Sequence, residues 1–466
     1  MSSVGIEMLA AGKGTRLKID RSKAFCPALG KSLVDYVISE SMKFSSAAGV
    51  KSHFTAVIGH KKEEVQKHIN EQYPGQFSFA WQKEQKGTAD ALRAYFDECP
   101  DNWKHPFTFV CCADTPLLEA ETFLRMWKEM QANPSLKACA GTFQAVVPTG
   151  YGRILRGKNG FRIIEEKDAT EAERKITEVN SGFYLVRTDY LKEHLSKVGN
   201  NNKSGEFYLT DIFEQTAEVS ALEFSDGSVF LGVNTLQQLE EITQVLRKRK
   251  LVNLMSEGVM MLDASSTYID WDVTVGAESV IYPGVNLFGK TKISAGVTIE
   301  TGAVLKNSTI ESGVIVLAYS HLEQVIIRKD AHVGPFARLR PDSDIGEGAK
   351  IGNFVEVKKS KLHSGVKVSH LSYVGDAEIN ENTNIGCGFI TCNYDGVNKH
   401  KTKIGKNVFV GSDVQVIAPL EIGDNSFVAA GSTITKDVPG GAFAIARSNQ
   451  STKEGLAHRF LKTKKP

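Results

Sequence analysis

The stretch that decides the fold is residues 269–305, IDWDVTVGAESVIYPGVNLFGKTKISAGVTIETGAVL, where an aliphatic residue stands at every sixth position. The spacing resumes at residues 333–357 and again at residues 404–434. Helices repeat every 3.6 residues or so and strands every 2, so neither explains a period of six. A hexapeptide period is typical of a parallel β-helix, in which six residues form one flat face and its corner. The recurring residues, whose side chains we expect in the coil interior, are Ile269, Val275, Ile281, Leu287, Ile293, Ile299, Leu305, Val333, Leu339, Ile345, Ile351, Val357, Ile404, Val410, Val416, Ile422, Val428 and Ile434.

Length and composition are those of an ordinary soluble protein with two or more domains. The 56 Lys and Arg residues nearly balance 54 Asp and Glu residues, which argues against a general nucleic-acid binder. No apolar run approaches the roughly 18 residues of a membrane span. The N-terminus, MSSVGIEMLAAGKG, lacks the pattern of a signal peptide. Seven scattered cysteines are typical of reduced thiols, so we expect a cytoplasmic protein.

The first half alternates short apolar runs with helix-like patterns, which predicts a parallel sheet covered by helices. A helix rich in charged residues should join this half to the coil. The predicted domains are 1–234, a linker helix over 235–256, and a β-helix domain over 257–466, with a polar loop after Thr391 and a solvated tail beyond Arg447. The predicted strands are 6–10, 54–58, 107–112, 183–186 and 229–233, and the predicted helices are 35–42 and 63–70.

A glycine-rich loop follows the first predicted strand. Its glycines would let backbone N–H groups approach phosphate oxygens closely. It lacks the third glycine of a dinucleotide fingerprint and the Gly-Lys-Ser/Thr of a Walker loop, so a bare strand-to-helix turn remains an alternative. Asp114 and Asn234 each follow a predicted strand, at the edge where α/β folds place ligands. Their carboxylate and amide oxygens suit Mg²⁺ held jointly with a nucleotide's phosphates.

The first half resembles the sugar-nucleotidyltransferases. The motifs that carry the resemblance are Leu9-Ala10-Ala11-Gly12-Lys13-Gly14-Thr15-Arg16, Lys23, Gln82, Gly87-Thr88, Ala113-Asp114-Thr115-Pro116-Leu117, Tyr151-Gly152-Arg153, Glu165-Glu166-Lys167-Asp168, Val179-Asn180-Ser181-Gly182 and Gly232-Val233-Asn234. They look like the uridylyltransferase half of the bifunctional bacterial enzymes that make UDP-N-acetylglucosamine. The resemblance implies a Rossmann-like α/β nucleotidyltransferase domain, with UTP as a substrate.

The same resemblance implies roles for individual residues. Asp114 and Asn234 would hold Mg²⁺, and Arg16 and Lys23 would contact phosphate during catalysis. The implied UTP and sugar contacts are Leu9, Ala10, Ala11, Gly12, Lys23, Gln82, Gly87, Thr88, Gly152, Glu165, Asn180 and Asn234. Three departures stand out: Cys112-Ala113 replaces Tyr-Gly, Ala89-Asp90 replaces Gly-His, and Glu7 replaces an aliphatic residue.

The coil carries a second set of polar residues. Stacking at about 18 residues per turn sets residues one or two coils apart side by side. Arg340, Lys358 and His370 could thus converge, with two cations for a sugar phosphate and one base for its amine. A lone histidine is otherwise an ordinary surface residue.

The coil resembles the acetyltransferase half of the same bifunctional family, which implies a left-handed β-helix. The reaction implied moves acetyl from acetyl-CoA to the amine of glucosamine 1-phosphate, with His370 as general base and Glu356 orienting it. The implied substrate and acetyl-CoA contacts are Arg340, Lys358, Tyr373, Asn384, Cys387, Asn393, Tyr394, Ser412, Ala430 and Arg447. The family builds this site between subunits of a homotrimer.

Two other interpretations remain open. One is a nucleotidyltransferase whose β-helix is only regulatory, as in ADP-glucose pyrophosphorylases. His370, the loop at 393–394 and the long coil argue against it. The other is a trimeric scaffold with decayed sites, which the departures at 112–113 and 89–90 keep open for the first half. Neither half suggests a nucleic-acid partner or a membrane span.

Overall fold

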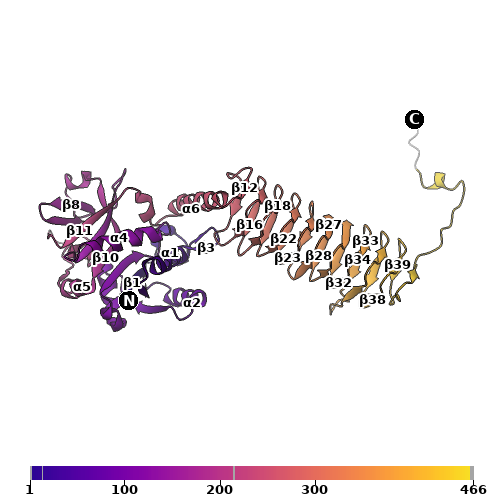
Figure 1. Cartoon of the computed structure of the whole chain (residues 1–466), viewed down its shortest axis with the longest axis horizontal. Helices are drawn as coiled ribbons and strands as arrows, with labels where there is room; N and C mark the ends of the chain where they lie inside the picture. Colours follow the sequence, from indigo (N-terminus) through magenta and orange to yellow (C-terminus); the bar gives the residue numbers. More distant parts are fainter. Residues whose placement is uncertain (1–2, 13, 214–215, 462–466) are drawn as a thin grey trace, which may run out of the picture. The chain divides into compact units, whose positions relative to one another are not determined.

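The computed structural model describes residues 3–12, 14–213 and 216–461 of the chain. The chain divides into two compact units, Met1–Leu246 and Arg247–Pro466. Figure 1 shows the first unit in indigo to magenta as a sheet with helices and the second in orange to yellow as stacked coils.

The first unit is built on one mixed sheet in the order β11-β7-β10-β6-β1-β4-β5. β1 lies inside the sheet and pairs in parallel with β4 and β6, and β10 is antiparallel to β6 and β7. The strands are β1 Ser3–Ala10, β4 Lys51–Ile58, β5 Phe77–Trp81, β6 Phe107–Cys112, β7 Ala138–Gln144, β8 Arg153–Gly157, β9 Gly160–Ile164, β10 Glu178–Arg187 and β11 Val219–Phe224, with the short pair β2 Pro27–Ala28 and β3 Lys31–Ser32.

Helices bury both faces of this mixed sheet. One core cluster joins the sheet to α1, α2 and α4 through residues such as Val37, Ile69 and Phe123. A second cluster joins its other face to α3 and α5 through Leu92 and Leu191. The helices are α1 Leu33–Ala48, α2 Lys62–Gln72, α3 Thr88–Glu98, α4 Ala120–Ala132, α5 Thr188–His194 and α6 Leu236–Ser256.

Most of the elements predicted from the sequence are confirmed. The expected strands at 6–10, 54–58, 107–112 and 183–186 lie within β1, β4, β6 and β10, and the expected helices at 35–42 and 63–70 lie within α1 and α2. The helix expected as a linker corresponds to α6, and the boundary between the two compact units falls within it. The domain limits at 234 and 257 stay predictions.

The strand predicted at 229–233 is wrong. The chain there forms a short 3-10 helix, η7 Gly227–Phe230, which begins where Ser228 N donates to Asp226 Oδ1 at 2.9 Å. Phe230 then packs among Phe143, Phe183 and Phe224. Apolar burial, and not strand pairing, explains the hydrophobic run.

Glu7 is the one carboxyl group in the middle of β1. Its side chain is fully buried, and neither of its oxygens has a hydrogen-bond partner among the described residues. Tyr95 of α3, also fully buried, interacts electrostatically with Glu7. Burial raises the pKa of Glu7 well above its ordinary value, so the carboxyl group holds its proton more tightly than in solvent.

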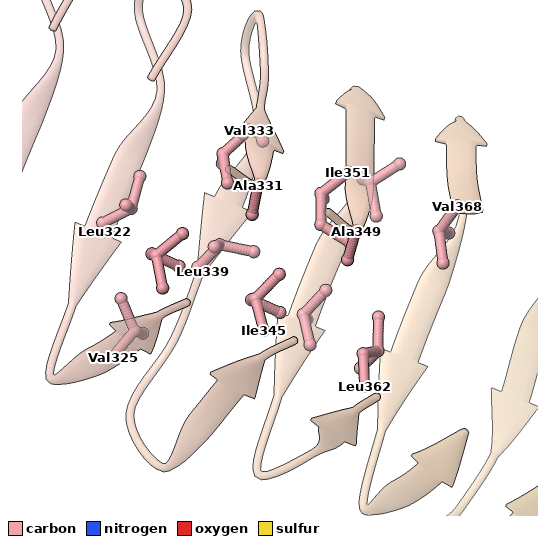
Figure 2. Close-up of a cluster of buried hydrophobic side chains, with 14 of the residues drawn as sticks. Leu322, Val325, Ala331, Val333, Leu339, Ile345, Ala349, Ile351, Leu362 and Val368 are labelled. Atoms are coloured by element: carbon pink, nitrogen blue, oxygen red, sulfur yellow. The ribbon is translucent and has the colours of Figure 1, made fainter. Parts of the chain in front are cut away.

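The second unit is a parallel β-helix with three faces, as expected for the left-handed hexapeptide form. Face A runs from β12 Met260–Met261 to β41 Phe443–Ala444, face B from β13 Tyr268–Ile269 to β40 Thr433–Ile434, and face C from β14 Thr274–Val275 to β38 Leu420–Ile422. All eighteen recurring aliphatics are buried, the most exposed at 5%. Figure 2 shows side chains of this buried core, among them Val333, Ile351 and Val368, stacked from turn to turn inside the coil.

Changes in turn length explain the interruptions of the six-residue spacing. Ile269 pairs with Leu287 on the next turn, whereas Ile299 pairs with Val316, so the second of these turns is shorter by a single residue. One turn is longer, because Ile379 pairs with Ile404 across the polar loop after β34 Ile390–Cys392. The register between turns is maintained through these changes, so surface residues remain aligned from coil to coil.

Candidate functional site

The first unit contains a cavity of about 430 Å³ at the carboxyl ends of β1 and β6. The glycine-rich loop after β1 forms one wall, and the start of α3 forms another. Of the residues named from sequence, the cavity brings together Leu9, Ala10, Ala11, Gly12, Lys23, Gln82, Gly87, Thr88, Asp114 and Glu165. Sequence reasoning did not find the further lining residues Ala24, Gln85, Ala91, Glu206 and Tyr208. Lys13 of the loop lies outside the described residues.

Two cations and two oxygen ligands meet beside this cavity. Lys23 Nζ is paired with Asp114 Oδ2 and donates to Asn234 Oδ1 at 2.8 Å. Arg16 Nη2 donates to the same amide oxygen at 2.8 Å. Lys23 is placed by the 3-10 turn η2 Lys23–Phe25, and Asn234 by the start of α6, where Gln238 Oε1 accepts from its backbone N–H.

These contacts test whether a divalent cation suits the site. The carboxylate of Asp114 and the amide oxygen of Asn234 already converge on one cation, the Lys23 ammonium. Hard oxygen donors are the ligands that Mg²⁺ takes, usually together with substrate phosphates and water. No cluster of three His, Cys, Asp or Glu side chains in the described ranges is placed to hold a metal without such help. The donor set fits Mg²⁺ shared with a nucleotide.

The cavity wall at the start of α3 depends on Gly87. Its φ of 122° lies in the region that favours glycine, and a Cβ there would lie 2.3 Å from the carbonyl oxygen of Phe207. Ala89 N donates to that oxygen at 3.0 Å, which ties α3 to the segment at Phe207. Gln82, directly after β5, donates through Nε2 to Gly87 O at 3.1 Å and to Asp90 Oδ2 at 2.8 Å.

The three residues expected near the sugar also lie together. Asn180 N donates to Gly152 O at 2.9 Å, and a Cβ on Gly152 would lie 3.5 Å from Glu165 Oε1. Burial raises the pKa of Glu165, although Thr210 opposes this shift by donating to Oε1 at 3.1 Å. Thr210 was missed because its segment has no motif of its own.

Ala113, one of the departures, fits its position without strain. Its φ is not positive, and its N–H donates to Leu9 O at 3.0 Å, so the backbone does not require glycine here. The methyl group is buried at the edge of the cavity. Burial raises the pKa of the neighbouring Cys112 to about 12, so this thiol stays neutral at physiological pH.

In the second unit, the hydrogen-bond partner of His370 differs from the one expected. His370, at the end of β30 Lys367–His370, is exposed, and its Nδ1 lies 2.7 Å from Asn353 Oδ1. Asn353 ends β27 Lys350–Asn353 and is the register partner of His370. Glu356 pairs with Arg340 at 2.9 Å, and the expectation that Glu356 orients His370 stays a prediction. The short turn between these two residues brings Asn353 level with His370.

Arg340 and Lys358 do come together, on the far edge of face B from His370. The pKa of Lys358 is lowered, first by Lys399 and then by desolvation and Arg340. Three cations therefore share one edge, which suits a phosphate. Tyr373 lies in register with Glu356 on the surface between the two edges. Lys399, on the polar loop, was missed because loops carry no period.

The remaining candidates follow one corner of the coil. The pairings on face A align His370, Cys387, Ser412 and Ala430 on successive turns. Arg447 Nη1 donates to Ala430 O at 2.9 Å and extends this column. Asn384 lies on face A in register with Phe409, which stacks on Phe427 at 4.9 Å.

The polar loop that carries Asn393 and Tyr394 is internally held. Asp395 accepts from the N–H groups of Val397 and Asn398, and it lies 2.7 Å from His400 Nε2. Lys399 Nζ lies 5.3 Å from the centre of the Tyr394 ring. Asn393 Nδ2 donates to Asp376 Oδ2 at 2.5 Å, which anchors the loop to the preceding coil.

Comparison with known proteins covers both units. Residues 7–246 match the nucleotidyl transferase family, and residues 401–436 match the bacterial transferase hexapeptide repeats. The chain is 41% identical over 461 residues to the Bifunctional protein GlmU of Geotalea uraniireducens (strain Rf4), covering 98% of this chain and 99% of that protein. The chain belongs to the GlmU family. The GlmU of Listeria monocytogenes serotype 4a (strain HCC23) is 42% identical, covering 97% of each chain, and that of Shouchella clausii (strain KSM-K16) is 41% identical, covering 97% and 98%.

Because the similarity to GlmU proteins runs through both units, it argues against a β-helix that is only regulatory. GlmU membership also agrees with the grouping of the candidate residues into two separate sets, one per unit. No helix in the described part of the chain has the length and apolar character needed to span a bilayer.

Proposed function

We propose that the two residue sets divide the work of a bifunctional GlmU enzyme between the two units. As a member of this family, the chain is a transferase that takes nucleotide and acetyl-CoA substrates. It transfers acetyl from acetyl-CoA to glucosamine 1-phosphate and then uridylyl from UTP to N-acetylglucosamine 1-phosphate, releasing pyrophosphate. The product is UDP-N-acetylglucosamine.

The first step is assigned to the face between His370 and the Arg340–Lys358 edge. Asn353 Oδ1 accepts the Nδ1 proton of neutral His370, which leaves the lone pair on Nε2. Nε2 takes a proton from the sugar amine as its nitrogen attacks the thioester carbonyl, and returns it to the departing thiolate of coenzyme A. Arg340 and Lys358 neutralise the sugar phosphate.

Acetyl-CoA is assigned to the corner column that begins at Cys387. A backbone donor at Ser412 would meet the oxyanion that develops on the thioester. Ala430 and Arg447 would contact coenzyme A further along the column, and Tyr373, Asn384, Asn393 and Tyr394 would surround the sugar and the acetyl group. The alignment of Cys387, Ser412 and Ala430 on successive turns supports the assignment of acetyl-CoA to this column.

The second step is assigned to the cavity of the first unit. The sugar phosphate oxygen attacks the α-phosphorus of UTP and pyrophosphate leaves, so no protein nucleophile is needed. Catalysis is then positioning plus charge neutralisation. Arg16, Lys23 and the glycine-rich loop would hold the triphosphate, and Gln82 with Gly87 and Thr88 would hold the base. Gly152, Glu165 and Asn180 would contact the sugar.

Asp114 and Asn234 would hold Mg²⁺, which supplies charge neutralisation on the phosphates. With the cation bound, Lys23 would be released from both oxygens to contact phosphate. The shared contacts of Lys23 with these two residues support this exchange.

We also propose that the β-helix forms a homotrimer. Tyr319, Phe336, Phe354 and Leu371 form a stripe along one corner, each between 48% and 60% exposed. Each takes a positive φ, and the three rings stack at 5.4 Å intervals. A contiguous exposed apolar stripe is typical of a surface that another subunit covers. Light scattering on the purified chain should give three times the chain mass.

A cytoplasmic location is proposed as well, supported by seven free cysteines.

The observation that carries the proposed function is the convergence of Lys23, Asp114 and Asn234 beside a cavity in one unit, together with the His370–Asn353 pair in the other. The test is a paired assay on one preparation, which measures pyrophosphate released from UTP and free thiol released from acetyl-CoA. We expect both signals, each requiring its own sugar phosphate. Loss of either signal with a correctly folded chain would contradict the assignment of that unit.

A further inference from the structure

The side-chain amide of Gln82 lines the cavity and is fixed by two neighbours from the start of α3. Its Nε2 donates to Gly87 O at 3.1 Å and to Asp90 Oδ2 at 2.8 Å. Asp90 stands in the first turn of α3, where the helix N-terminus favours a negative charge. Gln82 itself is 5% exposed, so its amide has little freedom to find other partners.

The identity of these partners decides which way the amide points. A backbone carbonyl and a carboxylate can only accept hydrogen bonds. Turning the amide over would set Oε1 against two acceptors, so its orientation follows from chemistry rather than from choice. Both N–H groups of Gln82 are then used, and no described residue donates to Oε1. The oxygen is the atom left for a ligand.

We propose that Asp90 determines nucleobase specificity by holding Gln82 with its amide oxygen toward the base. The proposal rests on the proposed function of the first unit. A fixed acceptor pairs with a base that presents a ring N–H, as uracil does at N3. It opposes a base that presents a ring lone pair at the same place, as cytosine does. Asp90 acts through Gln82 and touches no substrate, so it is a positioning residue.

The test is the ratio of kcat/KM for UTP to that for CTP, measured by pyrophosphate release with N-acetylglucosamine 1-phosphate. Asp90→Asn keeps the size of the side chain but lets it donate, so only the carbonyl of Gly87 still favours one orientation of the Gln82 amide. We expect the UTP-to-CTP ratio to fall about tenfold, the effect of one hydrogen bond. Asp90→Glu restores an acceptor and should recover most of the ratio.

Asp97→Asn is the matched control. Asp97 is exposed on the same helix, seven residues further on and thus on the same face, so its substitution removes the same charge. Its ratio should equal that of the wild type. An unchanged UTP-to-CTP ratio in Asp90→Asn overturns the proposal. This includes the case in which kcat/KM falls equally for both nucleotides, as a purely structural role would give.

Failure of the proposed function has a different signature. A wild-type chain that releases no pyrophosphate from UTP or CTP contradicts uridylyl transfer and leaves base selection to be measured by binding. Calorimetric titration of UTP and CTP into the wild type and both asparagine variants then decides it. Preferential UTP binding that only Asp90→Asn reduces supports the proposal, and equal binding of both nucleotides by the wild type overturns it.

Discussion

Replacing Glu7 should stabilise the first unit, and the gain should grow with pH. The carboxyl group lies in the central strand with no hydrogen-bond partner among the described residues. Tyr95 from α3 and the thiols of Cys111 and Cys112 from β6 are the titratable groups that interact with it, and none is a cation. An unsatisfied buried polar group costs about 1–3 kcal/mol, so Glu7→Leu should recover an amount of this order.

The sign of the pH dependence follows from the raised pKa of Glu7. Below the unfolded pKa of about 4.3, both states carry the proton and the group has no pH-dependent effect. Above it, the unfolded chain releases the proton while the folded unit retains it, so unfolding is increasingly favoured. The loss is about 1.4 kcal/mol per pH unit up to the folded pKa, or about 3–6 °C in melting temperature for a unit of this size.

Thermal unfolding followed by tryptophan fluorescence measures this effect, because Trp81, Trp103 and Trp127 lie in the first unit and only Trp271 lies in the second. The comparison is between wild type, Glu7→Leu and Glu7→Gln across pH 5–7. Glu7→Gln keeps the size and the polar group but cannot titrate. The pH dependence of stability due to this residue should therefore disappear, while the gain in stability should be smaller than that of Glu7→Leu. A difference between wild type and Glu7→Gln that does not change with pH would refute the reasoning.

Three further predictions concern the candidate sites. Asp114→Asn should abolish Mg²⁺-dependent pyrophosphate release and leave acetyl transfer near wild type, because the amide offers no charge to the metal; full activity at ordinary Mg²⁺ would assign the ion to another carboxylate. His370→Ala should lower the rate of acetyl transfer by about 10²–10⁴-fold, the range for a positioned general base. A loss below tenfold would make His370 a structural residue. Asn353→Ala should shift the pH profile of acetyl transfer. A thiol reagent should block acetyl transfer, and bound acetyl-CoA should protect against it. Cys387→Ala should be active and resistant to the reagent, while Cys392→Ala should stay sensitive. Inactivation of Cys387→Ala at the wild-type rate would show that Cys387 does not line the acetyl-CoA site.

The fold could be predicted largely from periodicity. The six-residue spacing fixes the coil because each recurring aliphatic must be buried, and all eighteen are. The strand expected at 229–233 failed because an apolar run reports burial and not pairing. Phe230 satisfies that burial from a 3-10 turn.

The candidate sites were predictable as sets but not as contacts. The resemblance named ten of the residues that line the cavity, yet it did not find Glu206, Tyr208 or Thr210, whose segment carries no motif. In the coil, a regular repeat cannot tell which turns are shorter by a single residue. The turn between Asn353 and His370 is one of these, so turn length decides which side chain contacts His370.

The three departures of the first unit also differ in what the structure offers them. Ala113 has an ordinary φ, and Asp90 is bonded to Gln82, so each fits its surroundings. Glu7 alone is left without a partner among the described residues. A site that had lost its function would have no reason to keep its charged groups assembled, yet Arg16 and Lys23 still converge on Asn234. We therefore expect the departures to affect stability and base selection, and the shared contacts of Arg16 and Lys23 with Asn234 argue against a decayed scaffold.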